Sequence, residues 1–342
     1  MRRVLVTGGC GFIGSQFVRM LIDEEPDAQI VNLDLLTYAG NPANLASVAE
    51  SPRYRFVQGD IRDLDAVSGL VADADWIINF AAESHVDRST SERAGEFIDT
   101  NVYGAYVMLE AAKRAGSGAR FLQVGTDEVY GDVPYPEFPD EEAQLQPSSP
   151  YSAAKAGADH LALAFHRTHG MDVIVSRCTN NYGPYQYPEK MIPLFIINAI
   201  EDEPVPLYDG GTQVRDWLRV EDHCTALHRL LLDGEAGEIY NIGANQDPEV
   251  PNGELTRMIL DALGKPESLI KPVEGLRPGH DQRYAVDTQK MRALGWEPEL
   301  DLVGGVGRTA RWYSEHRDWW EPIRSGAYRE YYEKHYGQRL GG

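Results

Sequence analysis

The sequence has 342 residues, of which 42% are hydrophobic, and a formal net charge of −21 at pH 7. This length suits two domains or one large one with a sizeable buried core. The strong negative charge disfavours nucleic acid and anionic membranes as partners. No apolar run approaches the roughly 18 residues of a membrane span, and the first glycines come too early for a signal peptide, so we expect a cytoplasmic protein.

Cysteine and histidine usage indicates neither a disulfide framework nor a metal site. Cys10, Cys178 and Cys224 are odd in number and widely spaced, without a Cys-x-x-Cys pair, so we expect buried thiols. His166 and His169 are three residues apart on a predicted helix, but no carboxylate or cysteine accompanies them. We therefore expect no metal.

The amino-terminal region has the pattern of a dinucleotide site. A short apolar strand over residues 3–7 precedes a glycine-rich turn and a helix from about residue 15 to 24, and a second strand over 29–33 ends in Asp34. Glycines in such a turn let a pyrophosphate approach the helix amino terminus, and the acid accepts hydrogen bonds from a ribose 2'-hydroxyl while repelling a 2'-phosphate. The pattern predicts NAD rather than NADP. The expected contacts are Gly8, Gly11, Phe12, Ile13, Gly14 and Asp34.

Strands and helices continue to alternate along the chain. Strands are predicted over residues 54–58, 76–80 and 119–124, with a helix over 101–115. This alternation predicts an α/β fold, a Rossmann-type doubly wound parallel sheet. Residues at the strand ends are further candidates for cofactor binding, although the alanines are equally explained by sheet packing. These residues are Asp60, Ile61, Ala81 and Ala82.

The stretch from Thr126 to Lys155 carries the candidate catalytic residues. Thr126, Asp127 and Glu128 follow directly after a predicted strand, where open α/β sheets bind ligands. Tyr151 and Lys155 are four residues apart on a predicted helix and share one face. A nearby ammonium lowers the pKa of a tyrosine from its usual value of about 10, so the pair is predicted to act as a base.

A second, smaller domain is predicted from a change in composition. After a strand over residues 172–177 the chain becomes rich in proline and tyrosine, yet residues 238–243 again have the pattern of a sheet strand. We therefore expect interleaved domains. The NAD-binding domain is predicted to comprise residues 1–180 and about 216–243, and the substrate-binding domain residues 181–215 and 244–342.

The glycine turn, Asp34 and Tyr151-x-x-x-Lys155 resemble the extended short-chain dehydrogenase/reductase superfamily over nearly the whole chain. Further motifs resemble the dTDP-glucose 4,6-dehydratase family in particular. Related epimerases usually carry small residues where this chain has Asp127 and Glu128. The motifs that carry the narrower resemblance are residues 36–41, 82–89, 126–131, 180–185 and 277–281.

The resemblance implies NAD-dependent dehydration of dTDP-glucose to dTDP-4-keto-6-deoxyglucose, with the NAD tightly bound and regenerated in each turnover. It implies that Tyr151, aided by Lys155, is the base at the 4-hydroxyl and that Thr126 hydrogen-bonds that oxygen. Glu128 is then the base at carbon 5 and Asp127 the acid for the leaving hydroxyl. Adjacent residues of a regular strand point to opposite faces, so the strand is expected to break into a turn at Thr126.

The resemblance also implies a homodimer through the helices over residues 101–115 and 151–169, and a set of residues around the substrate and nicotinamide. Arg215 has the alternative of pairing with Asp216. The residues implied for the substrate are Asn180, Lys190, Arg215, Asn252, Arg277 and His280, with Pro206, Leu207 and Tyr208 near the thymine, and those implied beside the nicotinamide and its ribose are Ser84 and Asn181.

Three other functions stay open at this stage. A sugar-nucleotide 4-epimerase or a dehydratase of another nucleotide sugar would use the same fold, and a non-catalytic NAD-sensing protein would need no acid pair. The sequence likewise leaves open the preference between thymine and uracil, the pathway that uses the product, and the effect of Gly125, where the family more often has serine, on the rate.

Overall fold

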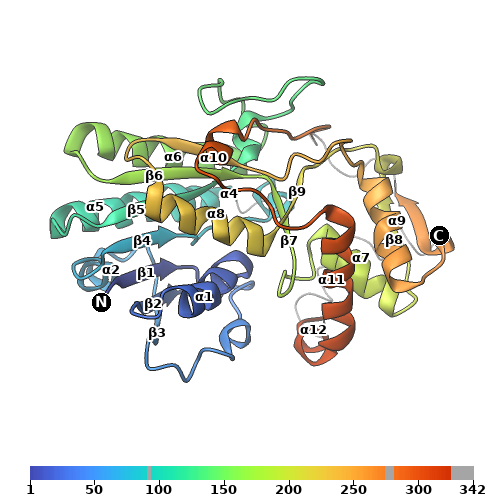
Figure 1. The fold of residues 1–342 in the computed structure, drawn as a ribbon, viewed down its shortest axis with the longest axis horizontal. Helices are drawn as coiled ribbons and strands as arrows, with labels where there is room; N and C mark the ends of the chain where they lie inside the picture. Colours follow the sequence, from blue (N-terminus) through green and yellow to red (C-terminus); the bar gives the residue numbers. More distant parts are fainter. Residues whose placement is uncertain (91–93, 274–280, 325–342) are drawn as a thin grey trace.

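The computed structural model describes residues 1–90, 94–273 and 281–324. The described residues form a seven-stranded sheet in which every neighbouring pair is parallel, in the order β10-β6-β5-β4-β1-β2-β3. The predicted Rossmann-type sheet is therefore confirmed (Figure 1). Its strands are β1 (Arg3–Thr7), β2 (Gln29–Asp34), β3 (Tyr54–Gln58), β4 (Trp76–Asn79), β5 (Arg120–Thr126), β6 (Val173–Cys178) and β10 (Ile239–Ile242).

Helices cover both faces of this sheet. One face packs against α1 (Phe12–Glu24) and α8 (Val220–Asp233), and the other against α2 (Leu64–Val71), α5 (Ala105–Ala115) and α6 (Pro150–His169). Val4 and Val6 lie in the first core, whereas Leu5 lies in the second. This alternation follows from the pleat, and burial of both faces explains the continuous apolar runs of central strands such as β1 and β4.

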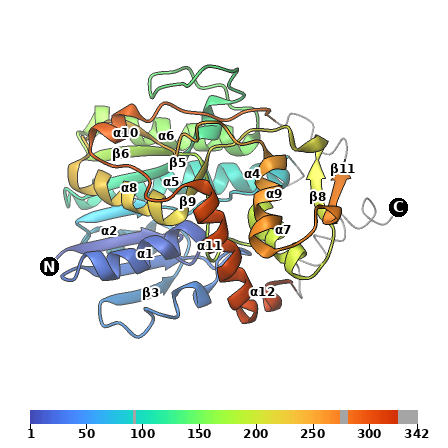
Figure 2. The same cartoon turned by 45° about the vertical axis from the view of Figure 1, so that its right-hand side comes forward.

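A second lobe lies beyond the carboxyl ends of the strands (Figure 2). Its core packs Phe195, Leu255 and Val306 between α7 (Met191–Ile200), α9 (Asn252–Leu263) and α11 (Leu302–Glu315). Two short parallel pairs complete it: β8 (Val205–Tyr208) with β11 (Ile270–Val273), and β7 (Asn180–Tyr182) with β9 (Trp217–Arg219). The remaining elements are α3 (Val86–Ser89), α4 (Ala94–Phe97), α10 (Gln289–Ala293), α12 (Arg317–Arg324), η1 (Pro42–Leu45), η2 (Ile98–Gly104), η3 (Asp127–Tyr130), η4 (Asp209–Gly211) and η5 (Glu267–Leu269).

The chain crosses between the two lobes more than once. β10 pairs with β6 at the edge of the large sheet, as predicted. Met291 of α10 and Trp296 also pack in the core of that sheet, although the sequence-based division assigns them to the smaller domain. The domain boundaries themselves stay a prediction.

The helix predicted from residue 101 begins earlier and is irregular. Residues Ile98–Gly104 form the π-helical turn η2, and regular α-helix follows in α5. The Asn101 side chain accepts a hydrogen bond from the Glu83 backbone N–H (2.8 Å) and donates to the Glu83 carbonyl (3.0 Å), which ties this turn to the loop after β4. No described helix is long and apolar enough to cross a membrane.

Candidate active site

A cavity of about 550 Å³ lies where the strands of the large sheet end and the second lobe begins. Loops that follow β1 to β6 form one wall, and residues 185–187, 189 and 190 form another. Most of the predicted site residues meet here. Those in the wall are Gly8, Gly11, Phe12, Ile13, Gly14, Asp34, Asp60, Ile61, Ala81, Ala82, Ser84, Thr126, Asp127, Glu128, Tyr151, Lys155, Asn180, Asn181 and Lys190.

The glycine turn provides a cradle that larger residues would fill. A Cβ atom on Gly14 would lie 2.4 Å from the Gly8 carbonyl oxygen, and one on Gly8, whose φ is +70°, would lie 2.7 Å from the Ala81 nitrogen. The N-cap of α1, Gly11, makes no side-chain hydrogen bond to the helix. The first N–H groups of α1 therefore remain available to an anion, and this geometry fits a dinucleotide pyrophosphate.

The Asp34 side chain also accepts backbone hydrogen bonds that fix the loops at the cofactor end of the cavity. Its Oδ2 accepts a hydrogen bond from the Cys10 N–H (2.9 Å), and its Oδ1 accepts one from the Leu36 N–H (2.8 Å). Burial raises the pKa of Asp34. Each carboxylate oxygen has two lone pairs, so the side chain keeps acceptor capacity for ribose hydroxyls.

The catalytic strand breaks where predicted. β5 ends at Thr126, and Asp127–Tyr130 form the 3-10 turn η3, with the Glu128 N–H donating to the Thr126 Oγ1 (3.3 Å). This turn replaces the strand alternation, so Asp127 and Glu128 both line the cavity. The predicted break at Thr126 is confirmed.

Asp127 is 3% exposed, and its Oδ2 has no hydrogen-bond partner within the described residues. Burial raises the pKa of Asp127 well above its usual value, and the charges of Glu128 and Asp216 raise it further. The raised pKa favours the protonated form of this carboxyl group, which suits a proton donor to the cavity.

Tyr151 and Lys155 lie in the first turns of α6. Ser149 caps this helix in a capping box with Ser152, which fixes where the helix begins. Lys155 Nζ donates to the Val124 carbonyl of β5 at 2.5 Å. Thr126 and Tyr151 both line the cavity, and the Thr126 side chain lowers the pKa of the Tyr151 phenol against the larger effect of burial.

The pKa of Tyr151 differs from the sequence-based expectation. Burial raises it well above its usual value, and the carboxylate of Glu128 raises it further. Burial thus outweighs the lowering expected from Lys155, whose ammonium also donates to the backbone of β5. Deprotonation of Tyr151 therefore needs a positive charge from a bound group.

Gly125 is an extended, buried residue of β5 and not a flexible joint. A Cβ atom there would lie 2.4 Å from the Ser176 carbonyl oxygen and 3.0 Å from Asp159 Oδ1. The glycine is explained by the close approach of β6 and α6, directly before Thr126.

We expect Gly125→Ala to lower the free energy of unfolding by about 1–3 kcal/mol, because the strand must move away from a fixed backbone oxygen. Gly69→Ala is the matched control, since a Cβ on this glycine of α2 would have no neighbour within 4 Å. That variant should gain roughly 0.5–1 kcal/mol. Chemical denaturation of both proteins measures the difference, and equal stability of the two would contradict this account of β5.

Some predicted substrate residues lie outside the cavity wall. Pro206 and Tyr208 belong to β8, and Asn252 begins α9, all in the second lobe. Arg277 and His280 fall outside the described residues. The structure therefore does not bring Pro206, Tyr208 and Asn252 together with the catalytic group.

Arg215 also lies behind the wall and not in it. Its guanidinium donates to the carbonyl oxygens of Val214 (2.7 Å) and Asp281 (2.8 Å) and stacks over the Tyr284 ring at 4.1 Å. Asp216, the alternative partner considered for Arg215, accepts from the Ala244 N–H (2.8 Å). The charge of Arg215 nevertheless acts on Asp127, whose pKa it lowers against the larger effect of burial.

Three residues that were not predicted as site residues contact one another beside the cavity, and of these Glu189 lines its wall. Tyr38 Oη donates to Glu189 Oε1 (2.8 Å), and His85 Nε2 lies 3.8 Å from Glu189 Oε2. The neighbouring Lys190 Nζ donates to the Ser84 carbonyl (3.0 Å). These contacts join the loops after β2 and β4 to the second lobe. They link positions more than a hundred residues apart, which no local pattern reveals.

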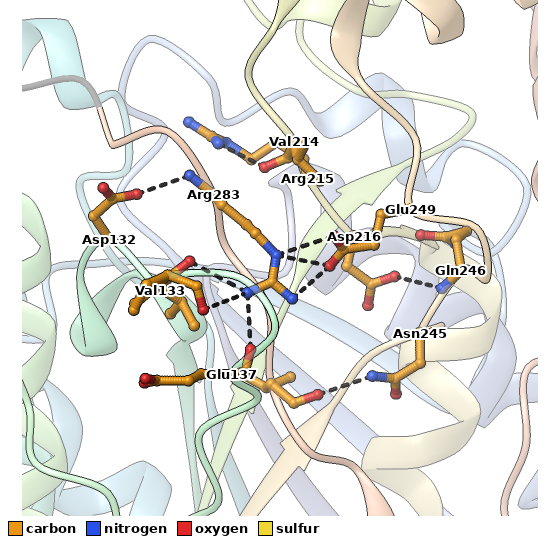
Figure 3. A network of polar contacts seen from close by, with 12 residues as sticks. Asp132, Val133, Glu137, Val214, Arg215, Asp216, Asn245, Gln246, Glu249 and Arg283 are labelled. Atoms are coloured by element: carbon orange, nitrogen blue, oxygen red, sulfur yellow. Dashed lines mark hydrogen bonds and ion pairs between the residues drawn. The ribbon is translucent and has the colours of Figure 1, made fainter.

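Arg283 fastens the segment that follows the catalytic turn (Figure 3). Its guanidinium contacts Glu249 Oε1 at 2.6 Å and donates to the carbonyl oxygens of Val133 (3.2 Å) and Glu137 (2.8 Å). Its backbone N–H donates to Asp132 Oδ1 (2.8 Å). One buried side chain thus connects the segment after η3 to the second lobe.

Arg283→Ala is expected to lower the free energy of unfolding by roughly 3 kcal/mol, because it leaves Glu249 and two carbonyl oxygens without their donor. Arg308→Ala, at an exposed position of α11, serves as the control and should change stability by less than about 0.5 kcal/mol. Urea unfolding compares the two. A loss for Arg283→Ala no larger than for the control would argue against the role of this network.

Comparison with known proteins extends these observations. Residues 5–309 match the family model described as GDP-mannose 4,6 dehydratase. A dTDP-glucose 4,6-dehydratase from Streptomyces niveus is 50% identical over 328 residues, covering 94% of this chain and 96% of the relative. The low-salt glycan biosynthesis protein Agl12 from Haloferax volcanii is 51% identical over 310 residues, covering 91% and 98% of the two chains.

Solved structures give the same result. A dTDP-glucose 4,6-dehydratase from Streptomyces venezuelae, solved with NAD bound, superposes with a TM-score of 0.90 at 49% identity. The match covers 94% of this chain and 99% of that one.

Proposed function

The chain belongs to the dTDP-glucose 4,6-dehydratase family, and from this premise we propose that it is a hydro-lyase that converts dTDP-glucose to dTDP-4-keto-6-deoxyglucose with NAD. One observation carries the proposal: Asp127, Glu128 and Tyr151 line a single cavity whose other end is the glycine cradle with Asp34.

A bound NAD supplies the hydride acceptor for carbon 4 of the sugar and returns the hydride to carbon 6. The cradle of Gly8, Gly11 and Gly14 would hold its pyrophosphate, and Asp34 its ribose. Asp60 and Ile61 after β3, and Ala81 and Ala82 after β4, complete the surface against which the dinucleotide would lie.

Tyr151 removes the proton from the sugar 4-hydroxyl, and Thr126 orients that oxygen. The positive charge needed to ionise Tyr151 comes from the bound nicotinamide and from Lys155. The resulting 4-ketone acidifies the proton on carbon 5, which Glu128 accepts. Asp127, whose protonated form is favoured by burial, donates its proton to the leaving 6-hydroxyl, so water departs across carbons 5 and 6.

The acid pair favours dehydration over the alternatives. A 4-epimerase needs the base and the cofactor but no proton donor for a leaving hydroxyl. An NAD sensor needs the cofactor site but neither a catalytic base nor a proton donor. Asn180 and Lys190 in the wall, with Ser84, support binding of the sugar diphosphate. The more distant Arg215, Asn252, Pro206 and Tyr208 are proposed to contact the nucleotide from the second lobe.

The test uses dTDP-glucose deuterated at carbon 4, with the product followed by mass spectrometry and NMR. Deuterium in a new methyl group at carbon 6 is the expected result. Label at carbon 4 of a galactose product would mean an epimerase. UDP-glucose and GDP-mannose are tested in parallel. If dTDP-glucose is unchanged but one of these is converted, the enzyme acts on another nucleotide sugar. If none of the three is converted, the protein is non-catalytic or acts on a different nucleotide sugar.

We further propose a cytoplasmic homodimer. Ile98 and Tyr103 of η2 and Tyr106 of α5 are 49%, 52% and 38% exposed, which places large apolar side chains on the surface beside α6. Such an exposed apolar group is typical of a partner surface. Light scattering should give twice the monomer mass, and Tyr103→Glu should shift the protein toward monomer.

A further inference from the structure

Asn181 of β7 lies in the cavity wall with its side chain held from two sides. Its Nδ2 donates to the Thr179 carbonyl at 2.8 Å, and its Oδ1 lies 2.8 Å from Nδ1 of His223 in α8. Its backbone carbonyl accepts from Gln186 Nε2 at 2.9 Å. The amide is therefore fixed between a backbone carbonyl and a histidine ring.

The Thr179 carbonyl determines which way this amide points. A carbonyl oxygen only accepts hydrogen bonds, so the NH₂ end of Asn181 must face Thr179 and the oxygen must face His223. An acceptor oxygen in turn requires a donor, which means that Nδ1 of His223 carries the proton.

The environment of His223 supports a neutral ring in this tautomer. The residue is 0% exposed, and its Nε2 is buried with no hydrogen-bond partner within the described residues. Burial also lowers the pKa of His223 to about 3. Protonation of Nε2 would place an unpaired N–H and a charge in an apolar site, which costs far more than leaving a lone pair there.

We propose that His223 is a positioning residue for the reaction: its Nδ1–H holds the Asn181 Oδ1, so that the remaining N–H of this side chain can act as a donor in the cavity wall. This inference rests on the proposed function and on the family resemblance, which implies that Asn181 lies by the nicotinamide and its ribose. A donor there suits the oxygen atoms of a nicotinamide carboxamide or a ribose.

The tautomer can be measured in the native protein without any substrate. Nitrogen-15 NMR of protein labelled at histidine separates protonated from unprotonated ring nitrogens, and the signal lost in His223→Asn identifies the residue. We expect a neutral ring with the proton on Nδ1 at neutral pH. A proton on Nε2, or an imidazolium, would overturn the inference whatever the activity of the enzyme.

Three variants test the effect on catalysis. His223→Asn keeps a donor at the position of Nδ1, His223→Gln moves the donor to the position of Nε2, and His223→Leu removes it. Loss of the hydrogen bond should lower kcat for dTDP-glucose about tenfold in the leucine and glutamine variants with little change in KM, and the asparagine variant should stay within about threefold of the native enzyme.

The outcomes separate the inference from the function on which it rests. Equal kcat values for the asparagine and glutamine variants, or a native kcat in His223→Leu, would refute the positioning role. Native enzyme that does not act on dTDP-glucose would refute the proposed function instead, while the NMR measurement would still decide the tautomer.

Discussion

Asp127→Asn is expected to lower kcat for dehydration of dTDP-glucose by about 10²–10⁴-fold, while exchange of the carbon 5 proton with solvent continues. Asparagine has no proton to donate to the leaving hydroxyl. Tyr151, Lys155 and Glu128 are unchanged, so oxidation at carbon 4 and proton removal at carbon 5 still occur. Mass spectrometry of the sugar in deuterium oxide measures the exchange, and NMR measures formation of the 6-methyl product.

The raised pKa of Asp127 adds a pH signature to this prediction. The native enzyme should lose activity as pH rises through the raised pKa, because the acid form disappears. A carboxyl group whose pKa is higher in the folded state contributes stability that is lost as pH rises toward that pKa. Asp127→Asn lacks this loss of stability. The melting temperature of the variant minus that of the native protein should therefore increase from acid to neutral pH.

Two further variants test whether this effect is specific to Asp127. Glu128→Gln removes the base at carbon 5, so it should abolish both the exchange and the product. Glu142→Gln changes a carboxylate at an exposed position of the same long segment and should behave as native. Full product formation by Asp127→Asn would remove this residue from the mechanism, as would a loss of exchange equal to that of Glu128→Gln.

The parts of the structure that local patterns specify were predicted from the sequence. The glycine turn requires a backbone approach that only glycine allows, and its strand, helix and delayed acid located β1, α1 and Asp34. Continuous apolar runs located the parallel strands because both faces are buried. The turn at Thr126 was predicted because two neighbouring acids must reach one substrate. This prediction came from the requirements of the reaction and not from secondary-structure propensity.

The parts that depend on tertiary contacts could not be predicted in this way. The spacing of Tyr151 and Lys155 puts both on one helix face, but it says nothing of Val124, whose carbonyl oxygen accepts the hydrogen bond from the ammonium. Likewise the contact between Tyr38 and Glu189 joins segments 151 residues apart. The close packing around Gly125 could not be predicted either, because its neighbours in space, Ser176 and Asp159, are distant in the chain.

Tyr151→Phe is expected to abolish exchange at carbon 5 as well as product formation, each by at least about 10²-fold, which distinguishes it from Asp127→Asn. The carbon 5 proton becomes acidic only after the 4-ketone forms, and the ketone requires the phenolate. The substitution keeps the aromatic ring that packs edge-on against Phe97, with centroids 6.3 Å apart, so folding should be little affected.

Tyr130→Phe provides a matched control in the same region. The Tyr130 hydroxyl donates to Asn241 Oδ1 (2.8 Å) and accepts from Arg177 Nη1 (2.9 Å), and it lies outside the cavity wall. Its loss should cost about 1–3 kcal/mol of stability but leave exchange at carbon 5 intact. Native exchange in Tyr151→Phe would mean that another group takes the hydroxyl proton. Because Tyr151 acts as a base, native activity should rise as pH rises through the pKa of Tyr151, which burial and Glu128 raise, whereas it should fall as pH rises through the raised pKa of Asp127.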